Sequence, residues 1–233
     1  MTNIDRKNVM LSAKRIMAFS PHPDDSEFIA GGYLSMLSEK GVHIKLVIIS
    51  DGSKGTKVLG ENVMDIRKKE QIEAAKILGI NDMEFLGIKD LEVPEPKSLM
   101  NIVLPKIREF SPDVIITVDP FLKYELHPDH INTGLAVMES VLFYSLPNVA
   151  SGIPHSNPPA LAVSPSNNPN VILNIDDYIK NKVDSLNAHK SQHLNIDAIL
   201  EVSSFYGKKI NCKYAEPFKV LFHDELHVYP FND

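Results

Sequence analysis

Short apolar runs alternate with segments of helical periodicity along most of the chain, and this alternation limits the folds that the chain can adopt. The run Ile44–Ile49 shows the pattern clearly, because it is dense in β-branched residues, as a strand covered on both faces is. The segment 62–78 that follows has apolar residues recurring on one side of a helix. Strands that alternate with helices in this way build βαβ units, so the sequence predicts a mainly parallel sheet flanked by helices.

The predicted elements cover nearly the whole chain. Strands are expected at residues 13–19, 44–49, 83–86, 113–118, 171–175 and 219–222. Helices are expected at residues 27–40, 62–78, 98–110, 129–144, 176–192 and 196–205. Pro105 is expected to bend or shorten the third helix, and Gly41 and Gly79 are well placed to end the first two. We therefore predict a single Rossmann-like α/β domain over residues 1–233.

Composition favours a small molecule as the partner. The chain has 24 basic and 30 acidic side chains and no basic block, which argues against nucleic acid or an anionic membrane surface. The first 14 residues lack the apolar core of a secretion signal, and no window approaches the ~18 apolar residues that a membrane span requires. Cys212 is the single cysteine, which fits a reducing compartment. We expect a cytoplasmic protein that acts on a small substrate.

The segment Ser20–Glu27 carries the first candidate site. It follows the apolar run Ile16–Phe19 and contains His22, Asp24 and Asp25. A strand that stops at a histidine and two carboxylates places them at its carboxyl end, where open α/β sheets bind ligands. One imidazole and one carboxylate at this spacing are able to hold a divalent metal, and the second carboxylate is then free to accept a proton.

A second cluster lies further along the chain. His127, Asp129 and His130 also follow an apolar run, Val114–Val118, and Asp129 is expected to cap the helix that comes next. A single histidine is usually a surface or hydrogen-bonded residue. Two His/Asp clusters, each with a proline inside and each after a buried strand, favour a shared metal site over a coincidence of packing. The sequence therefore predicts a zinc hydrolase.

Two loops are candidates for contact with the substrate. The segment 50–57 is rich in glycine but lacks the spacing of a phosphate-binding loop, so we predict a loop at the edge of the substrate site. The segment 145–170 is rich in proline, serine and asparagine and has no clear periodicity, and we predict a substrate loop there. Dinucleotide binding is disfavoured, because His22–Asp25 occupies the place where the glycine fingerprint would follow the first strand.

The motifs together resemble those of the LmbE-like (PIG-L) family of zinc-dependent N-acetylglucosamine deacetylases. The resemblance rests on the two His/Asp clusters and on Gly31–Gly32 after the first of them, and it extends over residues 15–220. Further matching segments are Asp65–Glu70, His189–Gln192 and Ala215–Phe218. Two positions depart from the family pattern: Ser26 stands where an acidic residue is frequent, and Tyr124 lies three residues before the second cluster rather than directly before it.

The resemblance implies a metal site and a general base. His22, Asp25 and His130 are expected to be the zinc ligands. Three protein ligands leave one zinc position open for water, whose pKa the metal lowers toward ~7. Asp24, beside the ligand Asp25, is then expected to take the proton of that water as it attacks the acetyl carbonyl.

The resemblance also implies supporting roles for four residues. His127 is expected to donate to the developing oxyanion if it is protonated, and Asp129 to orient a neighbouring imidazole. Arg67 and His189 resemble family positions that line the sugar site. His189 and His193 are also four residues apart in a predicted helix, as in a helical metal pair, but the segment between them lacks the glutamate of H-E-x-x-H.

The predicted reaction is hydrolysis of the N-acetyl group of a GlcNAc-type sugar, which releases acetate and a free amine. Two alternatives stay open: hydrolysis of a different amide on the same scaffold, and a metal-binding or sugar-binding protein without catalysis. The spare carboxylate of Asp24 argues against the second, because a pure binding site does not need it. Two histidines and one aspartate also accept Fe(II) or Co(II). The resemblance further suggests a homo-oligomer, a trimer or a hexamer.

Overall fold

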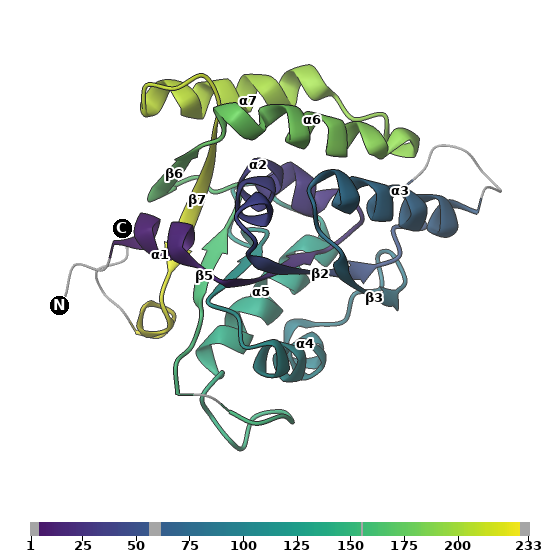
Figure 1. The fold of residues 1–233 in the computed structure, drawn as a ribbon. Coiled ribbons are helices and arrows are strands. Elements are labelled where there is room, and N and C mark those ends of the chain that lie inside the picture. The colour runs from purple at the N-terminus through teal and green to yellow at the C-terminus, as the bar shows by residue number, and fades with distance from the viewer. Residues whose placement is uncertain (1–4, 56–61, 155, 229–233) are drawn as a thin grey trace.

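The computed structural model describes residues 5–55, 62–154 and 156–228 (Figure 1). Its strands are β1 (Arg15–Ser20), β2 (His43–Ser50), β3 (Asp82–Ile88), β4 (Val114–Thr117), β5 (Ala160–Val163), β6 (Val171–Asn174) and β7 (Ala215–Leu221). They form one sheet in the order β3-β2-β1-β4-β5-β7-β6. The five strands from β3 to β5 are parallel, and β7 runs antiparallel to both of its neighbours. The predicted α/β fold with a mainly parallel sheet is confirmed.

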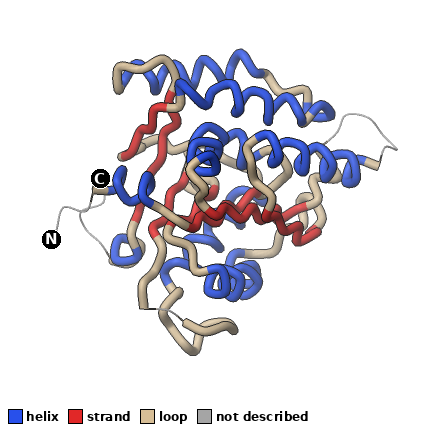
Figure 2. The backbone as a smooth tube through the Cα atoms, viewed as in Figure 1, coloured by secondary structure: helices blue, strands red, loops and turns tan. Residues whose placement is uncertain are grey.

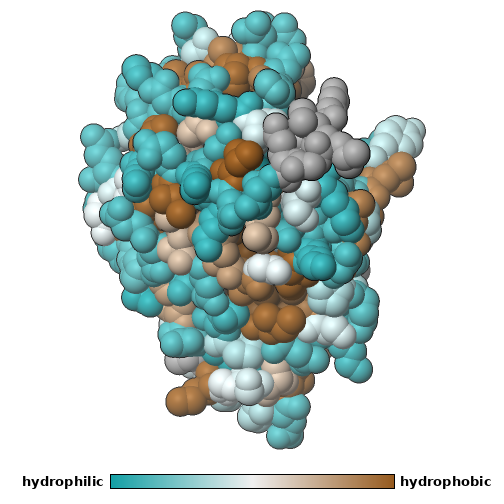
Figure 3. Space-filling view, turned by 90° about the vertical axis from the view of Figure 1, so that its right-hand side faces the viewer, coloured by the Kyte–Doolittle hydropathy of each residue, from teal (hydrophilic) through white to brown (hydrophobic). Residues whose placement is uncertain are grey.

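Helices cover both faces of this sheet (Figure 2). They are α1 (Arg6–Ser12), α2 (Asp25–Glu39), α3 (Val63–Ile77), α4 (Pro96–Phe110), α5 (Pro128–Leu142), α6 (Ile179–Ala188) and α7 (Ile196–Lys209), with short 3₁₀ turns η1 (Asp176–Tyr178), η2 (Lys190–Gln192) and η3 (His223–Glu225). Helix α6 packs against α2 and α3, and α7 packs against β7. None of the helices that the structure describes is long and apolar enough to cross a membrane. The side of the molecule in Figure 3 has apolar patches among hydrophilic surface.

The core consists of two layers, one on each face of the sheet. Along β1, Ile16 and Ala18 point into the layer beneath α2, whereas Met17 and Phe19 point into the layer beneath α4 and α5. All four side chains are at most 1% exposed. This alternation follows from the pleat of a strand, which turns successive side chains to opposite faces. Because both faces of β1 are covered, the strand is a fixed base for the residues that follow it.

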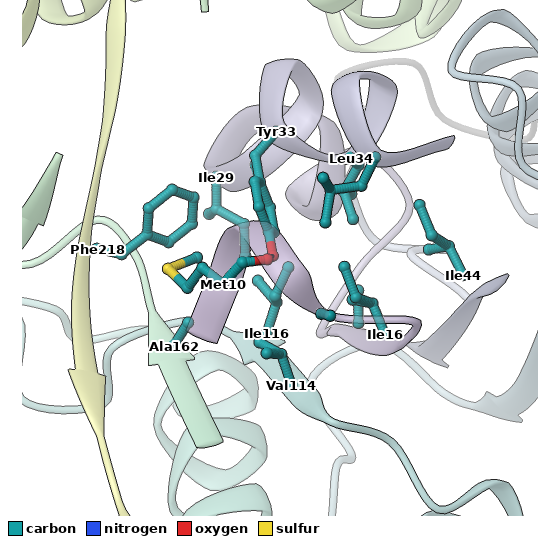
Figure 4. Close-up of a cluster of buried hydrophobic side chains, with 14 of the residues drawn as sticks. Met10, Ile16, Ile29, Tyr33, Leu34, Ile44, Val114, Ile116, Ala162 and Phe218 are labelled. Carbon is teal, nitrogen blue, oxygen red and sulfur yellow. The ribbon is translucent and has the colours of Figure 1, made fainter. Parts of the chain in front are cut away.

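The layer beneath α2 joins elements that are distant in the sequence (Figure 4). Tyr33 of α2 packs edge to face on Phe218 of β7, with ring centroids 5.5 Å apart. The Tyr33 hydroxyl donates a hydrogen bond of 2.7 Å to the carbonyl of Met10 in α1, so this buried polar group has a partner. The contacts attach the C-terminal strand to the first βα unit.

Helix α2 is interrupted at Ala30, whose backbone has φ −148° and ψ 16°. Just after the interruption, the backbone N–H groups of Gly32 and Tyr33 donate to the two carboxylate oxygens of Glu216, at 2.9 and 2.8 Å. Lys182 of α6 pairs with the same carboxylate at 2.6 Å. A buried ion pair from β7 and α6 therefore supports the irregular turn of α2.

Three predicted elements differ from the observed ones. Helix α4 keeps its full length although Pro105 lies inside it. Of the expected bend or shortening, the shortening is therefore wrong. A proline in a helix interior costs about 3 kcal/mol, and burial of Leu99, Val103 and Ile107 on the inner face offsets that cost. The helix predicted over 176–192 is shorter in the structure, where the regular helix α6 lies between two 3₁₀ turns.

The third difference concerns the segment 145–170, which is not one continuous loop. Its residues 160–163 form the buried strand β5, which pairs in parallel with β4. The beginning of the segment is held by the buried guanidinium of Arg108, which donates to the carbonyls of Phe143, Tyr144, Leu146, Val149 and Ser151. Of the predicted loop 50–57, residues 56 and 57 lie outside the described part of the chain.

Candidate active site

The two His/Asp clusters meet at the centre of the sheet. Strand β1 lies between β2 and β4, so the chain leaves β1 toward one half of the sheet and β4 toward the other. Such a switch point opens a crevice at the carboxyl ends of the two strands. His22 and Asp25 follow β1, while His127 and His130 lie at the start of α5, after β4. The fold therefore brings the predicted residues to one edge of the sheet.

Three of these residues place their donor atoms close to one another. His22 Nδ1 lies 3.4 Å from Asp25 Oδ2, and His130 Nε2 lies 3.6 Å from the same oxygen. The donor atoms of His22, Asp25 and His130 all lie within 4.8 Å of one another. Two ligands of one tetrahedral zinc ion, each about 2.0–2.2 Å from the metal, lie about 3.3–3.5 Å apart. The donor set therefore fits zinc in its chemistry, and the spacing of Asp25 from each histidine is close to that of a zinc site.

The other nitrogen of His22 is held by carboxylates. His22 Nε2 lies 3.1 Å from Asp129 Oδ2 and 3.3 Å from Asp90 Oδ1. Burial favours the neutral ring, but hydrogen bonds to Asp25 and Asp90 outweigh it and raise the pKa of His22 to about 10. Burial opposes the ionised form of Asp90 too, yet the imidazole of His22 lowers the pKa of Asp90 to about 2. The charged ring must lose its Nδ1 proton before that nitrogen can bind a metal. Asp129 and Asp90 would keep the remaining proton on Nε2.

His130 has a similar arrangement with Glu125. Its Nδ1 lies 3.1 Å from Glu125 Oε2, so the ring can donate there and leave Nε2 directed toward Asp25. The other oxygen of Glu125 accepts the backbone N–H of His127 at 2.8 Å. One carboxylate thus orients a candidate ligand and fixes the turn that leads into α5.

Asp24 lies beside the donor set and is held by a cation. Its carboxylate is 3.2 Å from the Arg67 guanidinium, and its side chain is 16% exposed. Burial, followed by the charge of Asp25, raises the pKa of Asp24 to about 7, although Arg67 acts in the opposite direction. A carboxylate with a pKa near neutrality is suited to accept and return a proton.

His127 is the N-cap of α5, so the expectation that Asp129 caps this helix is wrong. The Nδ1 atom of His127 accepts the backbone N–H of Asp129 at 3.3 Å, while the Asp129 carboxylate is buried against His22. Burial, together with the charges of His22 and His130, lowers the pKa of His127. Because Nδ1 is an acceptor, the neutral ring carries its proton on Nε2 and is able to donate without being protonated further. Donation by His127 to a developing oxyanion stays a prediction.

A cavity of about 370 Å³ opens next to these groups. Its lining consists of Asp24, Asp25, Phe28, Ile29, Val118, Asp119, Leu122, Glu125, His130, Pro165 and Leu194. The lining is thus mainly apolar, with a few carboxylates and one imidazole, as is typical of sites for small ligands. Pro165 is the contribution of the segment 145–170.

Comparison with known proteins places the chain in a family. Residues 17–141, more than half of the chain, match the PIG-L family, described as GlcNAc-PI de-N-acetylase. The chain belongs to the PIG-L family. This confirms the resemblance found in the sequence motifs.

Two curated relatives of this PIG-L chain align over most of its length. The chain is 30% identical to the diacetylchitobiose deacetylase of Thermococcus kodakarensis over 233 residues, which cover 94% of this chain and 87% of the relative. It is 30% identical to the probable N-acetyl-alpha-D-glucosaminyl L-malate deacetylase 2 of Bacillus cereus over 236 residues, or 94% and 99% of the two chains. Among solved structures, the N,N′-diacetylchitobiose deacetylase of Pyrococcus horikoshii, complexed with its inhibitor MPG, has a TM-score of 0.93 and 31% identity and covers 99% of this chain and 92% of that one.

The two residues that the family resemblance assigned to the sugar site lie behind the donor set of the PIG-L chain. Arg67 is 3% exposed, and besides Asp24 its guanidinium binds the carbonyls of Gly52 and Pro23. His189 is 1% exposed, and its Nε2 lies 3.6 Å from Glu27 Oε2. In this structure Arg67 supports the loops that follow β1 and β2, whereas His189 lies against Glu27 of α2. Direct contact with a sugar stays a prediction for each.

The helical metal pair considered for His189 and His193 is not formed. His189 is the C-cap of α6, and His193 follows the turn η2 in a left-handed conformation with φ 49°. The two residues therefore do not lie on one helical face.

Sequence reasoning missed two acidic residues of the PIG-L site, Asp90 and Glu125. Asp90 lies two positions after β3, at the same edge of the sheet as the donor set, and Glu125 lies two positions before the second cluster. The available signal was that ligating histidines usually donate their second N–H to a carboxylate. Several acids near each motif satisfy that description, so only the fold identifies the partners.

Proposed function

We propose that this chain hydrolyses the N-acetyl group of a GlcNAc-containing small molecule and uses zinc to do so. The observation that carries the proposal is a spare carboxylate, Asp24, beside a three-residue donor set in a cavity of suitable size. A site that only binds metal does not need this group. The relatives described above are named as deacetylases of diacetylchitobiose and of a glucosaminyl malate, which supports the same chemistry here.

His22, Asp25 and His130 would hold the metal. When bound, zinc supplies a Lewis acid that polarises an amide carbonyl and lowers the pKa of water. Asp129 and Asp90 keep the proton of His22 on Nε2, and Glu125 does the same for Nδ1 of His130, so each ring offers its free nitrogen to the metal.

Asp24 would carry the proton transfers. Its carboxylate accepts the proton of the attacking water and then gives that proton to the leaving amine, so the base is restored at the end of each cycle. Arg67 holds this carboxylate at 3.2 Å and favours its ionised form, against the effect of burial. His127 would donate from Nε2 to the oxygen on which negative charge develops.

Four further assignments stay predictions within this proposal. Zinc is favoured by the donor set, but Fe(II) and Co(II) suit the same ligands. Location in the cytoplasm rests on the sequence alone. Association into a trimer or hexamer is supported by exposed apolar side chains after β4, where Phe121, Tyr124 and Leu126 are 68%, 83% and 83% exposed. The segment 145–170 would contact the substrate through Pro165.

The test is acetate release by the zinc-loaded protein from N,N′-diacetylchitobiose and from other N-acetylated amino sugars. Replacing Asp24 by Asn should lower kcat by about 10²–10⁴-fold, the usual contribution of a general acid–base group, with zinc content unchanged. Asp184→Asn, at an exposed position on α6, is the matched control and should keep full activity. A panel that is inert with zinc loaded would favour hydrolysis of a different amide. An Asp24→Asn variant as active as the parent would exclude Asp24 as the base.

A further inference from the structure

Asp24 has a backbone conformation that L-amino acids rarely adopt. Its φ is 112° and its ψ is −25°. Residues other than glycine avoid positive φ because Cβ then approaches the backbone, so a surrounding contact must hold Asp24 in place. This strained residue is the proposed general base, and its conformation determines the direction in which its carboxylate points.

Gln71 makes the contact that holds the backbone of Asp24. The Asp24 N–H donates a hydrogen bond of 3.0 Å to Gln71 Oε1. Gln71 comes from the middle of α3 and has 0% exposure, so water does not compete for this bond. If the peptide before Asp24 rotated toward a relaxed conformation, the N–H would leave its only acceptor among the described residues.

The orientation of the Gln71 amide is itself fixed. Its Nε2 donates a hydrogen bond of 2.7 Å to Glu27 Oε1, and Glu27 also has 0% exposure. A flipped amide would place Oε1 against the Glu27 carboxylate and an N–H group against the N–H of Asp24. Both contacts would be repulsive, so Gln71 has one stable orientation.

Arg67 lies one helical turn before Gln71 and faces the same loop. Its guanidinium holds the Asp24 carboxylate, while Gln71 holds the Asp24 amide. Side chains at i and i+4 lie next to each other on a helix, so α3 contacts Asp24 through both its carboxylate and its backbone N–H. Arg67 holds the carboxylate, and Gln71 holds the backbone that determines where this carboxylate points.

We propose that Gln71 is a positioning residue for the proposed deacetylation, which acts by holding the peptide of Asp24 in its strained conformation. The inference rests on the proposed function, since it assigns the effect of Gln71 to the proton transfers of Asp24. Gln71 does not line the cavity described above and is not one of the donor residues. Its loss should therefore act on kcat and leave both zinc content and KM nearly unchanged.

Two substitutions separate positioning from a general contribution to packing. Gln71→Met keeps the length of the side chain but removes both hydrogen bonds. Gln71→Glu keeps an acceptor for the Asp24 N–H but places a second acid against Glu27, which destabilises a buried site. Positioning predicts that Gln71→Glu retains more kcat than Gln71→Met although it is the less stable variant. A packing role predicts that kcat follows stability.

The experiment measures acetate release from N,N′-diacetylchitobiose, zinc content and thermal stability for both variants. A misplacement of about 1 Å in a catalytic group costs about 10²-fold in rate, so Gln71→Met should lower kcat by roughly 10- to 100-fold, with KM within about twofold of the parent. A kcat for Gln71→Met within about twofold of the parent would overturn the proposal. So would a loss of kcat that follows the order of stability.

A control variant and the Asp24→Asn variant complete the test. Asn181→Ala also removes a hydrogen bond made by a side-chain amide, here from Asn181 of α6 to the Ser35 hydroxyl of α2 at 2.7 Å, away from the donor set and the cavity. It should lower stability and leave kcat unchanged. If the parent is active but Asp24→Asn is equally active, the assignment of the base fails. If Asp24→Asn is inactive and Gln71→Met is fully active, only the role of Gln71 fails.

Discussion

The ion pair between Lys182 and Glu216 offers a direct test of what holds α2 in place. The two charges are 2.6 Å apart, and their side chains are 3% and 2% exposed. The carboxylate also accepts the N–H groups of Gly32 and Tyr33, next to the interruption at Ala30. A single substitution of Glu216 therefore removes the partner of one ammonium group and of two backbone donors.

The expected loss follows from these three donors. Breaking a buried ion pair by removing one partner costs about 3–5 kcal/mol, and a buried N–H left without a partner costs about 1–3 kcal/mol. The terms overlap, so Glu216→Ala should lower the free energy of unfolding by roughly 4–6 kcal/mol. That is a large part of the roughly 5–15 kcal/mol that stabilises a typical domain. Glu216→Gln should cost less than Glu216→Ala, because its carbonyl still accepts one N–H.

The assay is denaturant unfolding at pH 7 of the parent, Glu216→Ala, Glu216→Gln, Lys182→Met and the double variant Glu216→Gln/Lys182→Met. The double variant should be more stable than the sum of the single losses predicts, because it buries no unpaired charge. Lys180→Met is the matched control: it lies on the same helix and breaks a pair whose side chains are 81% and 43% exposed, so it should cost less than about 1 kcal/mol. If the losses of the two single variants add within about 0.5 kcal/mol in the double variant, the ion pair does not hold α2 as described. The same conclusion follows if Glu216→Gln costs no more than Lys180→Met.

Two further predictions concern the carboxylate that contacts His130 and the effect of pH. Glu125→Gln should weaken zinc binding by about 10- to 100-fold, as measured by competition with a chelator, while Glu92→Gln at an exposed ion pair should not; equal affinities in both variants would contradict the role given to Glu125. Burial raises the pKa of Glu84, but Lys106 and Lys45 outweigh burial and hold that pKa below its usual range. The ionised form of Glu84 therefore stabilises the protein above its unfolded pKa, and this contribution is lost as the pH falls through its folded pKa. Glu84→Gln should cost less than about 1 kcal/mol at pH 7, and this cost should shrink as the pH falls through the folded pKa of Glu84. Denaturant unfolding of both proteins in the presence of a chelator measures it, and a cost that grows as the pH falls would contradict the prediction.

The parallel strands were predictable because their composition follows from their burial. The run Ile44–Ile49 matches β2 closely, since a strand covered on both faces requires apolar side chains throughout. The position of the donor residues was predictable for a related reason: parallel strands end at one edge, so polar residues after β1 and β4 must lie close together.

Other features depend on contacts that the sequence does not encode locally. The strand β5 is only four residues long, in a segment rich in proline, and pairing with β4 rather than local propensity determines its conformation. Glu125 and Gln71 carry no signal of their own, because many acids and amides near a motif could make such contacts. Their parts in the site follow from the docking of α3 and α5 onto the sheet.

The division of the donor set between the end of β1 and the start of α5 makes a bound ion a cross-link. His22 and His130 are separated by more than a hundred residues of chain, so an ion that ties them together closes a long loop that the unfolded chain leaves open. Free metal at about 100 times its dissociation constant adds about 2.7 kcal/mol to the stability of a folded protein. The folded fraction of a destabilised variant in a cell would then depend on the concentration of available zinc. A variant that does not fold in metal-poor medium could therefore fold when zinc is added, although its substitution is unchanged.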